Sequence, residues 1–228
     1  MSTHIVINSV NRRDFNNTSS SNCEIVLNKS VFAKCAELSY FQAPNTFYNV
    51  TSKNNTFLLN SATISITSGC YSLNDLFTEI LSVLPVGSTL LYNEVTNQCE
   101  LTFLAPATLD LSTSRFHLLL GFKKKIYGPA TNFISEHPPK IYQSYIFIQS
   151  SLSSNIVNDL GYHSTFCIPI QSNRGEMITF YNRTQFSSRP KVHDTNIHSI
   201  KFVLKDEYDE VLEGAGDFSL ILQVVENI

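Results

Sequence analysis

Six histidines make a metal site the first chemistry to search for in this sequence. The densest group is His193, Asp194 and His198, which places a carboxylate between two imidazoles. Both groups are ordinary zinc ligands, but successive positions of a strand face opposite ways, so these three side chains would not converge on one ion. None of the five cysteines forms a C-x-x-C pair that would complete a zinc site. We therefore predict no metal site and no cofactor.

The residue patterns of common catalytic sites are absent or incomplete. There is no G-x-S-x-G nucleophile motif. The two glycines of residues 213–216 precede a strand-like segment, whereas a phosphate-binding loop leads into a helix. The acidic residues 206–210 are typical of a solvated hairpin turn, not of two opposed glycosidase carboxylates. The sequence predicts no catalytic residues, and we do not expect an enzyme.

The charge pattern does not indicate a basic surface that would bind nucleic acid. The formal net charge is −3, and the basic run Lys123, Lys124 and Lys125 is short. Such a run usually stays in water, so we expect a solvated loop there and no specific nucleic acid partner. Arg174, Gly175 and Glu176 are expected to form a hairpin turn.

The remaining composition indicates a globular protein made inside a cell. Hydrophobic residues make up 43% and charged residues 15%, a low charge that fits a surface covered by neighbouring subunits. The N-terminal segment lacks the basic and apolar regions of a signal peptide, and no apolar run approaches the roughly 18 residues of a membrane helix. The widely spaced cysteines are expected to be reduced, buried thiols.

The strongest local pattern is an amphipathic helix over residues 71–84. Its apolar residues recur with the period of a helix: Leu73, Leu76, Phe77, Ile80, Leu81 and Leu84. Ser72 is the expected N-cap, and Pro85 and Gly87 end the helix. A hairpin over residues 89–104 follows, turning at Thr96 and Asn97. A second short helix then ends at Gly121, a typical C-cap.

Most other apolar segments alternate with the period of a strand. These segments are residues 5–7, 23–27, 33–41, 57–59, 62–66, 141–149, 165–170, 177–181, 197–205 and 217–225. We expect residues 1–21 to form an arm outside the core and residues 22–228 to form one all-β domain, with residues 123–140 as a long loop. Connection lengths favour antiparallel pairing, as in a β-sandwich or jelly roll.

The order of these parts resembles the penton (minor capsid) proteins of virophages and Polinton-like viruses. The resemblance rests on Tyr71-x-x-x-Asp75-Leu-Phe77, on Leu91-Tyr-Asn93 with Leu101-Thr-Phe103, on Leu119-Leu-Gly-Phe122, and on the closing segment of residues 217–224. It implies a single jelly-roll β-sandwich of two four-stranded antiparallel sheets with short helices in the connections.

The resemblance also implies a function. Proteins of this kind are structural virion proteins that form homopentamers at the five-fold vertices of an icosahedral capsid, next to a double jelly-roll major capsid protein. The functional residues would then be interface residues, and the sequence alone does not number them. The alternative is a β-sandwich carbohydrate-binding or viral attachment domain, which would display exposed aromatic side chains on one sheet face or a calcium loop.

Overall fold

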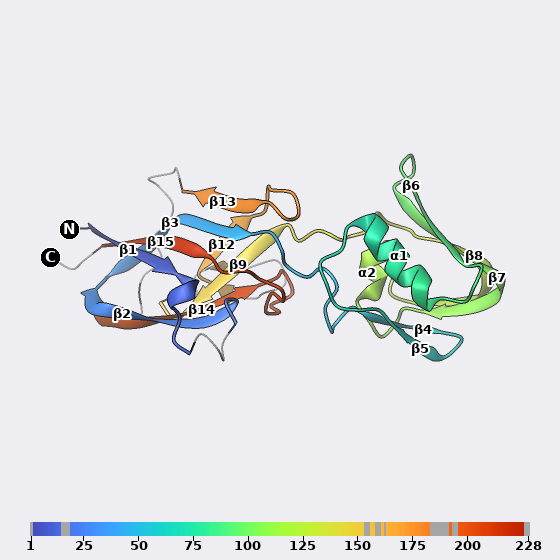
Figure 1. Cartoon of the computed structure of the whole chain (residues 1–228), viewed down its shortest axis with the longest axis horizontal. Helices are drawn as coiled ribbons and strands as arrows, with labels where there is room; N and C mark the ends of the chain where they lie inside the picture. Colours follow the sequence, from blue (N-terminus) through green and yellow to red (C-terminus); the bar gives the residue numbers. More distant parts are fainter. Residues whose placement is uncertain are drawn as a thin grey trace. The chain divides into compact units, whose positions relative to one another are not determined.

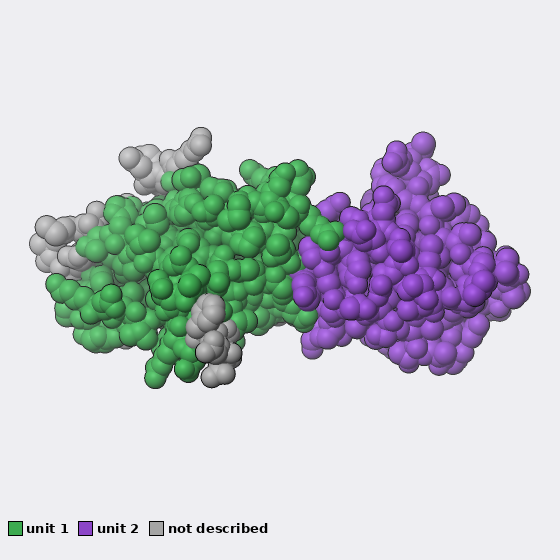
Figure 2. Space-filling model, in the orientation of Figure 1, with its two compact units in different colours: residues 1–47, 143–228 green, residues 48–142 purple. Residues whose placement is uncertain are grey.

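The protein consists of two compact units. The computed structural model describes residues 2–14, 19–152, 156–157, 161, 163–182, 192 and 196–225. Unit 1 combines Met1–Phe47 with Gln143–Ile228, and unit 2 is Tyr48–Tyr142 (Figure 2). Unit 2 is therefore an insertion into the sequence of unit 1, each unit having a hydrophobic core of its own. This differs from the single domain over residues 22–228 that we predicted.

Unit 1 is a jelly roll of two four-stranded antiparallel sheets (Figure 1). Sheet A has the order β1 (Ser2–Asn8), β15 (Ser219–Val225), β3 (Cys35–Pro44) and β13 (Met177–Tyr181). Sheet B has the order β12 (Phe166–Pro169), β9 (Tyr145–Ser150), β14 (Asn196–Lys205) and β2 (Asn22–Phe32). A short 3-10 helix η1 (Ser9–Asn11) follows β1, and β10 (Ile156–Val157) pairs with β11 (His163–Ser164). The predicted fold class is confirmed.

The core of unit 1 is formed by the inward faces of both sheets. Phe218 packs between Phe41 and Phe202, with ring centroids 5.9 and 6.2 Å apart. In β15, Leu220, Leu222 and Val224 are all buried, as the alternation of the sequence predicts. The sandwich is therefore held by side chains from strands that lie far apart in the sequence.

The N-terminal segment is part of the jelly roll, so the prediction of an arm outside the core is wrong. β1 pairs with β15 along its whole length, from Ser2 opposite Val225 to Asn8 opposite Ser219. Ile5 and Ile7 are buried in the core. A local pattern identifies the strand, but its partner lies at the other end of the chain, and that pairing creates the burial.

Unit 2 is a five-stranded antiparallel sheet with two helices. The order is β5 (Ala62–Ser65), β4 (Thr56–Leu59), β7 (Gln98–Asp110) and β6 (Thr89–Asn93), and β8 (Ile126–Ile134) also pairs with β7. The helices are α1 (Leu73–Val83) and α2 (Phe116–Leu120). Cys99, Leu101 and Phe103 point from β7 into the core, as predicted for this hairpin.

Helix α1 begins and packs as its sequence predicts. The Ser72 hydroxyl accepts a hydrogen bond from the Asp75 backbone N–H (3.2 Å) and donates one to the Asp75 carboxylate (2.6 Å). Leu76, Phe77 and Ile80 are buried in the core of unit 2. The cap satisfies one free N–H of the first turn, while the apolar face supplies most of the stability.

The segment of residues 123–140 is not the long loop that we predicted, because it contains β8. Gly128 and Pro129 lie inside this strand, and both residue types are typical of loops. Pro is tolerated at the edge of a sheet, where its missing N–H removes no ladder bond. The register between β7 and β8 also shifts between Thr102 and Ala107, so no regular alternation marks the strand.

The cysteines give the first testable expectation. All five are free thiols, and Cys23 and Cys99 are buried. Burial raises the pKa of Cys23 to about 11, although nearby Arg12 lowers it, and burial raises that of Cys99 to about 12. We expect a reducing agent to leave the melting temperature unchanged, and native alkylation monitored by mass spectrometry to modify Cys23 and Cys99 last. A thiol that stays protected after denaturation would reveal a disulfide and contradict the assignment.

Candidate interaction surfaces

The structure does not assemble the residues that first suggested metal chemistry. His198 is exposed on β14, and His193 and Asp194 lie outside the described residues. Among the described residues, no group of three His, Cys, Asp or Glu side chains could hold a metal ion. In the same part of the chain, no helix is both long enough and apolar enough to cross a membrane.

Residues 206–210 and residues 174–176 both form turns, as predicted. The Asp206 N–H donates to the Glu210 carbonyl (2.8 Å), and Lys205 pairs with Asp209 (2.8 Å) across the same hairpin. The second segment is the turn around Gly175, which has a φ of 80°. There the Glu176 carboxylate accepts from the Asn173 N–H (2.8 Å). These carboxylates stabilise turns.

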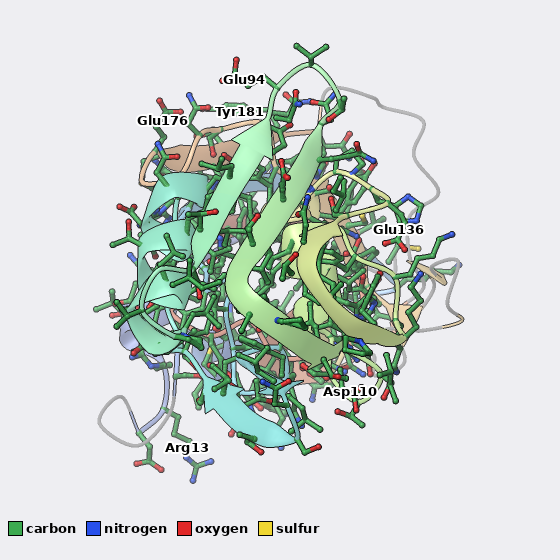
Figure 3. The ribbon with its side chains drawn as sticks, turned by 90° about the vertical axis from the view of Figure 1, so that its right-hand side faces the viewer. Arg13, Glu94, Asp110, Glu136, Glu176 and Tyr181 are labelled. Atoms are coloured by element: carbon green, nitrogen blue, oxygen red, sulfur yellow. The ribbon has the colours of Figure 1, made fainter. Side chains whose placement is uncertain are left out.

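One lysine of the basic run belongs to a polar cluster around Glu136, shown beside β8 in Figure 3. The Glu136 carboxylate pairs with Lys125 Nζ (2.9 Å) and accepts hydrogen bonds from Tyr127 Oη (2.7 Å) and the Lys123 N–H (3.0 Å). Lys125 Nζ also lies 4.5 Å from the centre of the Tyr127 ring. Lys125 is therefore bound within unit 2, while Lys123 and Lys124 are exposed as expected.

The Glu136 cluster predicts a loss of stability in acid. Partial burial acts to raise the pKa of Glu136, but the bonds from Lys125, Tyr127 and Lys123 outweigh it and lower that pKa from 4.5 to about 2. The ionised carboxylate therefore stabilises unit 2 above pH 4.5, and this contribution disappears as the pH falls to about 2. We expect Glu136→Gln to reduce the free energy of unfolding by about 1–2 kcal/mol near pH 7 and by little near pH 2. Urea unfolding at both pH values measures the difference, and an equal effect at both would contradict the cluster.

The outer face of sheet A carries an apolar row that crosses all four strands. Val6 on β1 lies opposite Ile221 on β15, Ile221 opposite Tyr40 on β3, and Tyr40 opposite Tyr181 on β13. We call these four residues the tyrosine row. Val6 is 74% and Tyr181 59% exposed, and the rings of Tyr40 and Tyr181 lie 5.0 Å apart. Large apolar side chains thus line the solvent side of the sandwich.

Polar residues flank the tyrosine row on both sides. One neighbouring row consists of Asn8, Ser219, Gln42 and Thr179. The other contains His4, Gln223 and Glu37, and the Glu37 carboxylate accepts a hydrogen bond from Asn182 Nδ2 (2.7 Å). An apolar centre with a polar rim is the usual anatomy of a protein interface.

The outer face of sheet B also carries aromatic side chains. Tyr145 and Phe147 on β9 have ring centroids 6.3 Å apart, and their opposite residues on β12 are Pro169 and Cys167. Tyr145 is 46% exposed. The two outer faces of the jelly roll are therefore both partly apolar, and they belong to different sheets of the same sandwich.

Unit 2 also has exposed aliphatic side chains, among them Val86, Leu91, Leu104 and Ile134. Leu91 and Ile134 flank Glu100 in one row across β6, β7 and β8, on the side of the sheet opposite Cys99 and Leu101. The hairpin of β6 and β7 projects from the unit, with Glu94 near its tip (Figures 1 and 3).

The tyrosine row has a signal in the sequence that a search for simple alternation misses. A strand with one buried face alternates, but β1 reads Ile5-Val6-Ile7 and β15 reads Leu220-Ile221-Leu222. Tyr40-Phe41 and Phe180-Tyr181 repeat the feature on β3 and β13. Continuous apolar runs indicate strands that are apolar on both faces. These runs therefore mark the outer face of sheet A.

Comparisons with known proteins show the fold. No family model matches the sequence, and no curated protein matches it. The crystal structure of the mavirus penton protein is similar over 99% of both chains, with a TM-score of 0.54 and 9% identity. A chain of the Sputnik virophage structure aligns over 99% of this chain and 98% of that chain, with a TM-score of 0.46 and 10% identity. This chain therefore has the fold of the mavirus penton protein over nearly its whole length.

Proposed function

We propose that this chain is a structural virion protein, the penton or minor capsid protein of an icosahedral capsid. The proposal is carried by the similarity to the mavirus penton protein over 99% of both chains. Proteins with a jelly-roll fold serve many functions, so the fold class by itself would say little about the function of this chain. Here the similarity extends through both units, the jelly roll and the inserted unit 2.

The proposed assembly is a homopentamer at each five-fold vertex. Each copy offers two different surfaces, and the rotation between neighbours closes after five copies. The double jelly-roll major capsid protein surrounds the ring, and the protein resides in the virion. The order of the helix, the hairpin and Leu119-Leu-Gly-Phe122 in the sequence supports the same proposal.

The mass of the protein under native conditions tests the ring. We expect monomers in dilute solution and a species of five copies as the concentration rises, measured by native mass spectrometry and analytical ultracentrifugation. A stable dimer or trimer that persists on dilution would contradict the five-fold ring. One chain has a mass of 25.7 kDa, so these species are well separated.

One observation favours the alternative, a carbohydrate-binding or viral attachment domain. Tyr181 and Tyr145 are exposed aromatic side chains on sheet faces, as such a domain requires. However, the rings of Tyr40 and Tyr181 are inclined at 52°, so they do not form one flat platform for a sugar ring. A glycan array distinguishes the two functions, because specific glycan binding abolished by Tyr181→Ala would favour the alternative.

A further inference from the structure

We propose that unit 2 is an independently folding module, and that Asn49 is the clasp that holds its two chain ends together. The chain enters unit 2 after Phe47 and leaves it before Gln143, so the module is one continuous insertion. This property goes beyond the penton function, because it concerns how the chain folds before any assembly.

The two units bury separate cores. The core of unit 1 is built from residues 5–47 and 146–224, and that of unit 2 from residues 50–141. Among the described residues, none belongs to both cores, and every strand pairing joins two strands of the same unit. A segment with its own core and its own sheet is able to open and close as one cooperative unit.

Asn49 joins the beginning of unit 2 to its end. Its Nδ2 donates to the Ile141 carbonyl (2.9 Å) and to the Tyr71 carbonyl (2.8 Å), and its Oδ1 accepts from the Tyr71 N–H (2.9 Å). The next residue, Val50, exchanges two backbone hydrogen bonds with Gly69 (2.8 and 3.1 Å). One side chain therefore ties together two positions that lie 92 residues apart in the sequence.

The clasp answers a problem that every inserted segment has. Chain ends fray unless something ties them down, and an insertion has two such ends. A carboxamide carries both donors and an acceptor, so a single Asn side chain satisfies three backbone groups at once. Val50 and Ile141, next to these bonds, are buried in the core of unit 2, so the clasp lies against the core that it closes.

Unit 1 holds its own side of the junction with different hydrogen bonds. Asn45 Nδ2 donates to the carbonyls of Ser172 (3.1 Å) and Asn173 (3.2 Å). The Ile170 N–H donates to the Ser144 carbonyl (2.9 Å). The residues before and after the insertion are thus bound to the same segment of unit 1. Opening of unit 2 breaks none of these bonds, and unit 1 is expected to stay folded.

Asn49→Ala and Asn45→Ala form a matched pair of variants in the full-length protein. The two substitutions are chemically identical and close in the sequence, but they remove hydrogen bonds from different units. The reporters are two buried thiols, Cys99 in unit 2 and Cys23 in unit 1. Thiol labelling in urea below the unfolding midpoint, followed by peptide mass spectrometry, measures how often each unit opens. Circular dichroism checks that each variant folds.

We expect Asn49→Ala to accelerate the labelling of Cys99 by about 10-fold and to change that of Cys23 by less than about twofold. Asn45→Ala should have the opposite selectivity. Phe77→Ala, which removes a core side chain of unit 2, should accelerate the labelling of Cys99 by about 100-fold or more without accelerating that of Cys23.

Two results would overturn the proposal. Labelling of Cys99 at the wild-type rate in Asn49→Ala would show that Asn49 is not the clasp. Equal acceleration of both thiols in Phe77→Ala would show that the two units unfold together. Neither result bears on the penton function, which is tested by the native mass and by the location of the chain in assembled particles.

Discussion

Replacing Gly121 with valine is expected to lower the free energy of unfolding of unit 2 by about 3 kcal/mol or more. Gly121 ends α2 with a φ of 78°, a left-handed conformation that a β-branched residue adopts at high cost. A side chain there would also overlap the carbonyl group of His137. The His137 N–H donates to the Gly121 carbonyl (2.9 Å), and the Lys140 N–H donates to the Leu118 carbonyl (2.9 Å), so this backbone lies against the helix end and has little room to move.

Gly128→Val is the matched control for this substitution. Gly128 lies on β8 without a left-handed φ, and a side chain there would meet no atom within 4 Å. We expect a change within about 0.5 kcal/mol. Gly121→Asn separates the strain of the positive φ from the steric overlap with His137, because Asn tolerates positive φ but still has a Cβ. Urea unfolding followed by circular dichroism measures the stability of all three variants. An unchanged urea midpoint for Gly121→Val would contradict the C-cap geometry.

Replacing Phe77 with alanine is expected to cost about 3–5 kcal/mol. Phe77 is only 8% exposed and faces the core of unit 2 together with Leu76 and Ile80, which are fully buried. Removing the ring leaves a cavity, which a packed core fills only in part by relaxing. The expected result is a lower urea midpoint with native-like secondary structure at low denaturant.

Thr78→Ala is the control on the opposite face of the same helix. Thr78 is exposed, and its hydroxyl donates to the Asn74 carbonyl one turn earlier (2.9 Å), a contact that adds little to helix stability. We expect a change within about 0.5 kcal/mol. Equal losses for Phe77→Ala and Thr78→Ala would show that the apolar stripe does not pack against the sheet.

Local sequence patterns predict helix α1, the end of α2 and the β6–β7 hairpin of unit 2, although they miss β8. The period of α1, its Ser72 cap and the Gly121 cap each depend on residues within a few positions. The same holds for the hairpin of β6 and β7. In each case the pattern and its physical cause lie in one short segment, so the element can be predicted from the sequence alone.

Long-range pairing explains what the sequence does not predict. β1 is buried by β15, more than two hundred residues away, and the jelly roll closes only when strands before and after unit 2 combine. No short segment carries that information, so local patterns favour one domain where the chain forms two units. The tyrosine row is likewise the product of three strand pairings, although the continuous apolar runs in its strands mark it once the pairing is known.

Imaging of assembled particles tests the penton function most directly. The chain is co-expressed with the double jelly-roll major capsid protein, and the purified shells are reconstructed by electron cryo-microscopy. The penton function predicts density for five copies of this chain at each five-fold vertex. Density for this chain at the trimeric face capsomers, or intact shells that lack it, would contradict the penton function.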